Sequence, residues 1–241
     1  MSTFEAVFAA AEPAIATHLA SIEQHAAALE SLGAEPPPGP RWTQDWFPRL
    51  DAAAAYSMVR RFRPRRIVEV GSGHSTRFLA RAARDGATGT TLTAIDPAPR
   101  ATLGGLEIEL LKTRVQEAGD APFARLAEGD FLVIDSSHKM APGSDVELLI
   151  ERVLPALPMG AYVHFHDIFL PDDYPEAWAW RRYTEQGAVS ALLAGSRYSI
   201  VFASAWILAR RKDLLAGSVI HRLPLVPGAI ESSLWLRKTG G

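Results

Sequence analysis

The sequence predicts an α/β fold in which helices cover both faces of a mostly parallel β-sheet. Three observations lead to this prediction. Short apolar segments alternate with helical ones from residue 66 onward, as in successive βαβ units. Several of these apolar segments end in Asp or His, and a glycine-rich turn, GSGHST (71–76), follows the first of them. In open sheets of this type ligands bind outside the carboxyl ends of the strands, so the polar residues mark the expected site.

The composition is that of an ordinary globular protein. The chain has 241 residues, of which 48% are hydrophobic and 22% charged, and its net charge of −2 argues against a nucleic-acid partner. It contains no cysteine, which excludes disulfides, thiolate catalysis and Cys-ligated zinc. The first residues lack the basic region of a signal peptide, and no apolar run approaches the roughly 18–20 residues that span a bilayer. We therefore expect a cytoplasmic protein with no membrane partner.

Residues 1–40 are expected to form an N-terminal helical extension and a proline-rich linker. Apolar residues at helical spacing predict helix over residues 3–31, with a break near Pro13. The segment GAEPPPGPRW (33–42) is the densest in proline and glycine and is typical of a linker. The extension could pack against the main domain, cover the site as a lid or form a dimer contact, so a homodimer is possible. Residues 41–241 then form the main domain.

The main domain is expected to begin with a helix after Pro48. The predicted parallel strands are residues 66–70, 92–95, 106–111, 131–134 and 161–166. A helix lies between the last two, where Ser144 and Glu147 form an S-x-x-E capping box before apolar residues that recur every three or four positions. Two further strands, residues 198–208 and 233–236, are expected as a closing antiparallel pair.

The glycine-rich turn is expected to bind a nucleotide-type cofactor. Gly71 and Gly73 allow a tight turn and a close approach of the backbone to a ligand. A dinucleotide fingerprint has a third glycine at position 76, where this chain has Thr76, which disfavours NAD without excluding it. Asp96, at the end of the next strand, can accept hydrogen bonds from both ribose hydroxyls of NAD or of S-adenosylmethionine. Glu69 can accept a hydrogen bond from the ammonium group of S-adenosylmethionine. The alternative for the whole segment is a plain turn between a strand and a helix that binds no cofactor.

A second polar group is expected at the ends of two later strands. Asp135 and His138 follow one strand, and His166 and Asp167 follow another. Two carboxylates at adjacent strand ends repel each other unless a cation or a proton lies between them. A divalent metal is the economical answer. Alternatively, Asp135 could cap a helix without a metal, and His138 could be a loop histidine bonded to the backbone.

Five motifs in order, EVGSGHST, AIDPAP, DFLVIDSSH, GSDVELLIERVLPAL and YVHFHDIFLPDDYPEAW, resemble the class I S-adenosylmethionine-dependent methyltransferases. The nearest resemblance is to small-molecule O-methyltransferases related to the macrolide-sugar methyltransferases of natural-product biosynthesis. It covers about residues 50–241 and implies a Rossmann-like sheet of seven strands, of which the last is antiparallel. The residues that it implies for S-adenosylmethionine are Glu69, Gly71, Gly73, Ser75 and Asp96. Ser72 and His74 lie in the same turn and are expected to contact the cofactor as well.

The same resemblance implies a metal-assisted reaction. Asp135 and Asp167 match acidic residues that bind a magnesium-type ion in that family, and His138 matches the general base. His166 stands where some relatives carry a carboxylate, so the metal set expected here is Asp135, His166 and Asp167. An imidazole ligand suits a transition metal better than magnesium. We expect magnesium or manganese rather than iron. Alternatively, His166 faces away from the metal and ligates nothing.

The implied reaction is O-methylation of a small molecule. The metal would hold a substrate hydroxyl and lower its pKa, His138 would take the proton, and the oxygen would attack the sulfonium methyl in line. The segment FLPDDYPEAWAW (169–180) can cover the substrate, with Tyr174 and Trp178 packed against it. Alternatively, these aromatic residues anchor the connection to the core.

Three other functions stay open at this point. A metal-dependent oxygenase on the same fold could use His138, His166 and Asp167 as a two-histidine-one-carboxylate iron site. An NAD-type oxidoreductase is disfavoured by Thr76 and by the lack of an obvious Tyr-x-x-x-Lys pair. A non-catalytic scaffold would have a vestigial site. The sequence leaves the substrate, the metal and the oligomeric state open.

Overall fold

The computed structural model describes residues 3–240, and within them seven strands form one sheet in the order β3-β2-β1-β4-β5-β7-β6. The strands are β1 (Arg66–Val70), β2 (Thr91–Ile95), β3 (Glu109–Leu111), β4 (Phe131–Ile134), β5 (Tyr162–Phe165), β6 (Tyr198–Ala203) and β7 (Leu234–Lys238). Strands β1 to β5 run parallel to one another, whereas β7 is antiparallel to both β5 and β6. The predicted Rossmann-like sheet with an antiparallel last strand is confirmed.

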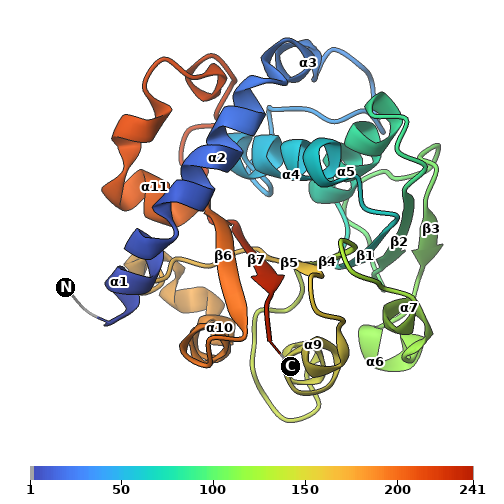
Figure 1. Ribbon diagram of the computed structural model, residues 1–241. Helices are drawn as coiled ribbons and strands as arrows, with labels where there is room; N and C mark the ends of the chain where they lie inside the picture. Colours follow the sequence, from blue (N-terminus) through green and yellow to red (C-terminus); the bar gives the residue numbers. More distant parts are fainter. Residues whose placement is uncertain (1–2, 241) are drawn as a thin grey trace.

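Helices cover both faces of this sheet, with α4 and α5 on one face and α9 and α10 on the other (Figure 1). The α-helices are α1 (Thr3–Ala10), α2 (Glu12–Glu23), α3 (Ala26–Ser31), α4 (Arg49–Phe62), α5 (His74–Asp85), α6 (Val115–Ala118), α7 (Ala121–Ala124), α8 (Asp145–Leu148), α9 (Leu154–Ala156), α10 (Glu185–Ala194) and α11 (Ser204–Arg210). The π-helical segment η1 (Leu149–Val153) joins α8 to α9, and η2 (Glu176–Arg181), η3 (Lys212–Leu215) and η4 (Val219–His221) are short 3₁₀-helices. Because helices bury both faces, β4 and β5 are buried along their whole length, and His164 of β5 is the one residue of the two strands that is not apolar or aromatic.

The N-terminal helices are part of the main core. Phe8, Ile15, Ile22 and Leu29 are buried within the same apolar cluster as the sheet, and α2 packs against both α4 and β6. Pro13 lies in the first turn of α2, where a missing N–H leaves no hydrogen bond unmade, so the break falls just before it. No residue of α1, α2 or α3 lines the cavity described below. The domain boundary at residue 40 stays a prediction.

Two element predictions need correction. The strand predicted over 198–208 ends at Ala203, and the remaining residues belong to α11, because a short apolar run fits a buried strand and a buried helix equally well. The strand predicted over 106–111 is limited to β3. The Ser144 hydroxyl accepts from the Glu147 amide (3.0 Å) as the capping box requires. The Glu147 carboxylate accepts from Gly143 N (2.6 Å) and not from the Ser144 amide, so only half of the predicted capping box is formed.

None of the described helices combines the length and the apolarity needed to cross a membrane.

Candidate active site

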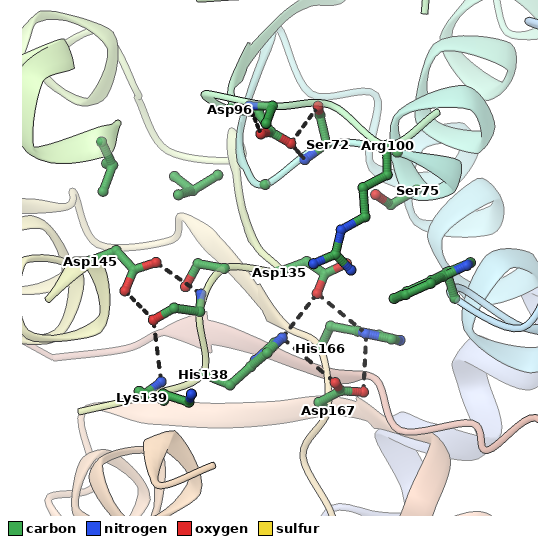
Figure 2. Close-up of a pocket in the computed structure, with 18 of the residues that line it drawn as sticks. Ser72, Ser75, Asp96, Arg100, Asp135, His138, Lys139, Asp145, His166 and Asp167 are labelled. Carbon is green, nitrogen blue, oxygen red and sulfur yellow. Dashed lines mark hydrogen bonds and ion pairs between the residues drawn. The ribbon is translucent and has the colours of Figure 1, made fainter. Parts of the chain in front are cut away.

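A cavity of about 730 Å³ opens at the carboxyl ends of β1, β2, β4 and β5. Its volume lies in the range of small-molecule sites, roughly 300–1,000 Å³. The predicted residues that line it are Gly71, Ser72, Gly73, His74, Ser75, Asp96, Asp135, His138, His166, Asp167 and Trp178. The structure therefore brings the glycine-rich turn and the second polar group together in one cavity, as Figure 2 shows for most of these side chains.

The two glycines of the turn serve different purposes. Gly71 has φ 83°, and a Cβ atom there would lie 1.8 Å from the backbone oxygen of Asp135, so the fold itself requires glycine. Gly73 has an extended φ of 170°, and a Cβ atom there would meet no protein atom within 4 Å. The fold gives no reason for glycine at position 73, and the open space beside it belongs to the cavity.

Thr76 takes the place of a third glycine because its hydroxyl ties the turn together. Thr76 Oγ1 accepts from Gly73 N (2.9 Å) and donates to Glu69 Oε2 (2.6 Å), while Ser75 Oγ donates to Glu69 Oε1 (2.5 Å). Burial, with a smaller contribution from the charges of Asp135 and Asp96, raises the pKa of Glu69 to about 8 despite these hydrogen bonds. Glu69 is not among the residues that line the cavity, so its contact with a cofactor stays a prediction.

Asp96 lies at the cavity wall with most of its acceptor sites in use. Asp96 Oδ2 accepts from both the amide (2.8 Å) and the hydroxyl (2.9 Å) of Ser72, and Oδ1 accepts from Ala98 N (2.8 Å). A carboxylate has about four acceptor sites. To accept from two ribose hydroxyls, Asp96 therefore needs the Ser72 hydroxyl to turn away.

The second polar group is a closed ring of alternating acids and imidazoles, visible at the centre of Figure 2. His138 Nε2 lies 3.2 Å from Asp135 Oδ1 and 3.6 Å from Asp167 Oδ2. His166 Nδ1 lies 3.6 Å from Asp135 Oδ1 and 3.3 Å from Asp167 Oδ1. Burial disfavours every charge here, yet the mutual pairing raises the pKa of both histidines well above 6.5 and lowers that of Asp135.

Glu185, a residue that the sequence reasoning missed, holds His138 from behind. Its Oε2 lies 2.9 Å from His138 Nδ1, and the amides of Thr184 (2.9 Å) and Glu185 (3.1 Å) donate to the His138 carbonyl. The Tyr183 ring lies 4.6 Å from the imidazole, centre to centre. His138 has φ 58°, an uncommon value for a residue with a side chain and one found disproportionately at functional sites. These contacts leave Nε2 directed at Asp135 and Asp167.

Asp51 holds His166 in the same way from the opposite side. It is fully buried in α4 and accepts from Ser204 Oγ (2.5 Å), Ser232 N (2.9 Å) and Ser233 N (3.0 Å). Its Oδ2 also lies 3.3 Å from His166 Nε2. The one sequence signal for Asp51 was a carboxylate in an alanine-rich, otherwise apolar helix segment.

The donor chemistry of this ring suits a divalent ion, although the side chains are not arranged around one. Among residues 3–240 no three or more His, Cys, Asp or Glu side chains form a ready metal centre, since those of the ring are paired with one another. Two imidazoles and two carboxylates are nevertheless a set that transition metals bind. Each imidazole also has its second nitrogen on a buried carboxylate, the usual arrangement for a metal-bound histidine.

The wall beyond the ring is aromatic and basic. Trp178, Tyr183 and Arg181 line the cavity there, and Lys139 and Arg100 line it nearby. Tyr174 is not among the lining residues, because its hydroxyl accepts from Gln186 N (3.2 Å) and its ring packs 5.8 Å from that of Phe169. Substrate contact by Tyr174 stays a prediction. The three cationic residues were not identified from the sequence.

Comparison with known protein families finds a match over the middle of the chain. Residues 68–168, from β1 to just past Asp167, match the sequence model of a methyltransferase domain. The chain contains a methyltransferase domain. With the sheet order and the antiparallel β7, it is of class I, the S-adenosylmethionine-dependent kind that its motifs resemble. The NAD-type alternative is thereby set aside.

Solved structures add the fold but not the substrate. The plantazolicin methyltransferase BpumL, in complex with a pentazolic desmethylPZN analogue and SAH, is 14% identical with a TM-score of 0.50 over 77% of this chain and 83% of its own. Cofactor-bound Rv0187 from MTB is also 14% identical, with a TM-score of 0.50 over 95% of this chain and 91% of its own. A search of curated proteins found no significant match.

Proposed function

We propose that this methyltransferase transfers the methyl group of S-adenosylmethionine to a hydroxyl of a small molecule, assisted by a divalent ion at Asp135, His166 and Asp167. The supporting observation is that one cavity joins the glycine-rich turn and Asp96 to the ring that contains His138. A cofactor and an acceptor bound in this cavity would be in direct contact, with no part of the protein between them. The cytoplasmic location and the homodimer remain expectations.

The end of the cavity formed by the glycine-rich turn and Asp96, here called the cofactor end, would hold S-adenosylmethionine through its shape and through hydrogen bonds. The space beside Gly73 admits the cofactor against the backbone, and Asp96 would bind the ribose with Ser72 and Ser75 nearby. His74 lines the same end, and burial first, then the charges of Arg77 and Arg41, lower its pKa to about 4. His74 is therefore neutral near pH 7 and does not repel the cationic sulfonium.

The end of the cavity formed by the ring of Asp135, His138, His166 and Asp167, here called the acceptor end, would activate the hydroxyl of the substrate. A divalent ion held by Asp135, His166 and Asp167 would supply positive charge that lowers the pKa of a bound hydroxyl. The acceptor oxygen forms the new bond to the methyl carbon, the S–CH₃ bond breaks with its electron pair left on sulfur, and the hydroxyl proton passes to His138 Nε2. His138 accepts that proton only in its neutral form, whereas its pairing with Asp135 and Glu185 raises its pKa, so an ion that engaged Asp135 would favour the neutral imidazole.

A binding experiment on metal-stripped protein tests this function. S-adenosylmethionine and S-adenosylhomocysteine should each raise the melting temperature, NAD should not, and magnesium or manganese should add a further rise. Asp96→Asn should weaken the cofactor effect, and Asp135→Asn should remove the metal effect. Asp120→Asn, at an exposed site, is the matched control and should change neither. Stabilisation by NAD alone, or a metal effect that survives Asp135→Asn and Asp167→Asn, would overturn the proposal.

Turnover is then measured as release of S-adenosylhomocysteine with a panel of phenols, vicinal diols and hydroxy acids. Activity with hydroxyl acceptors and none with matched amines or thiols supports O-methylation. Stabilisation by ferrous iron alone, without any response to the S-adenosyl compounds, would instead favour the oxygenase alternative.

A further inference from the structure

Near the acceptor end, the cavity is lined by cationic side chains that methyl transfer does not require. Arg181, Lys139 and Arg100 all line the cavity, and Figure 2 shows Arg100 and Lys139 on opposite sides of the Asp135–His138 pair in that view. Within residues 3–240, Arg100 and Lys139 form no ion pair, and the one ion pair of Arg181 is at the limit of contact, 4.0 Å from Asp167 Oδ2. The cavity also contains carboxylates, but those of the ring are paired with His138 and His166, so the unpaired cations point to an anionic group on the acceptor.

Arg181 is the best placed of the three cations. Its guanidinium carbon lies 4.1 Å from the Trp178 ring centre and 5.5 Å from that of Tyr183, and Nη1 donates to the Tyr183 hydroxyl (2.9 Å). These aromatic contacts fix the guanidinium plane. The side chain is only 26% exposed, and its Nε is buried without a hydrogen-bond partner. A desolvated cation with free N–H groups gains most from a carboxylate, which can bind such a group with two parallel hydrogen bonds.

The distance from Arg181 to His138 limits the shape of that acceptor. Asp167 Oδ2 lies 4.0 Å from Arg181 Nη1 and 3.6 Å from His138 Nε2, so the two nitrogens are at most about 7.6 Å apart. A ligand that lies between the two nitrogens, with a hydrogen bond of about 2.8 Å to each, has only a few ångströms between its anionic oxygen and its hydroxyl oxygen. The carboxylate and the hydroxyl must therefore sit on neighbouring parts of the molecule.

The remaining wall favours a planar ring. Trp46, Phe47, Trp178 and Tyr183 all line the cavity, and aromatic side chains bind flat apolar groups by stacking or edge contacts. We propose that the acceptor is an aromatic hydroxy acid whose carboxylate binds Arg181 and whose adjacent hydroxyl meets His138. This inference rests on the proposed methyltransferase function and names its substrate class.

Equilibrium binding to the protein loaded with S-adenosylhomocysteine tests the inference. The probes are 2,3-dihydroxybenzoate, its neutral counterpart 2,3-dihydroxybenzamide, and 3,4-dihydroxybenzoate, whose carboxylate is farther from both hydroxyls. We expect the first to bind at least tenfold more tightly than either of the others. Arg181→Gln should abolish this preference, whereas Arg182→Gln, an exposed neighbour outside the cavity lining, should retain it.

The outcomes separate the two proposals. If S-adenosylhomocysteine itself does not bind, the proposed function fails. If it binds and the acid shows no preference over the amide, the methyltransferase proposal stands and the substrate class is wrong. A preference that survives Arg181→Gln as fully as Arg182→Gln overturns the assignment of Arg181 as the carboxylate anchor.

Discussion

The two ends of the cavity are built from different kinds of contact. At the cofactor end the hydrogen bonds join residues close in sequence, such as Gly73 to Thr76, three positions apart, or Ser72 to Asp96, 24 apart. At the acceptor end His138 is bonded to Glu185, 47 positions away, and His166 to Asp51, 115 away. The first end is encoded in a short motif, whereas the second exists only after α4 and α10 have packed. The predictions below test this difference, from the largest expected effect to the smallest.

The largest effect is expected at Gly71. A side chain there would collide with the backbone of Asp135, and the residue would also be held at positive φ. Gly71→Ala should therefore prevent folding or lower the free energy of unfolding by about 3 kcal/mol or more. Gly73→Ala should leave the urea midpoint unchanged and weaken the binding of S-adenosylhomocysteine instead. A stable Gly71→Ala protein would show that β1 and β4 can separate at this point.

The next effect concerns Asp51, whose hydrogen-bond partners at the acceptor end are all far from it in sequence. Asp51→Ala would leave Ser204, two backbone amides and His166 without their buried acceptor, so we expect a loss of about 3–5 kcal/mol in the free energy of unfolding. Asp51→Asn keeps one acceptor oxygen and should lose less. Urea denaturation measures both. Equal losses for the two variants would mean that shape rather than hydrogen bonding matters at this position.

The difference between the two ends also explains what the sequence could predict. Alternating apolar segments and the glycine turn place β1, β2, β4 and β5 within a residue or so, and the polar residues at their ends fall in one cavity. Asp51 and Glu185 were missed because nothing near them in sequence marks a partner. Arg181 was missed although Trp178 and Tyr183 flank it, because the sequence does not show that both rings pack on its guanidinium and not on that of Arg182. Residues 204–208 were mistaken for strand because apolar runs do not reveal which element buries them.

The third prediction is a pH dependence from the cofactor end. The pKa of Glu69 is raised to about 8 in the folded protein from an ordinary 4.5, so between these values the folded state binds more protons than the unfolded state. Stability from this group is present at low pH and is lost as pH rises toward 8. Between pH 6 and 8 the free energy of unfolding should fall by about 1–3 kcal/mol relative to Glu69→Gln, which cannot titrate. Parallel pH profiles for the two proteins in urea would contradict it.

The smallest effect is expected at Glu185, where charge and hydrogen bonding can be separated. Glu185→Gln keeps an acceptor for His138 Nδ1 but removes the negative charge, so kcat should fall about tenfold, whereas Glu185→Leu frees the imidazole and should lower it about a hundredfold. Affinity for S-adenosylhomocysteine should not change, because Glu185 contacts only the acceptor end. The assay uses the fastest acceptor of the panel, with exposed Glu176→Gln as control. Equal rates for the Gln and Leu variants would mean that the carboxylate merely fills space behind His138. A graded loss would show that the charge of Glu185 supports His138 as the base. Glu185 reaches His138 only when α10 has packed against the sheet, so this part of the acceptor end depends on the folded structure and not on a local motif.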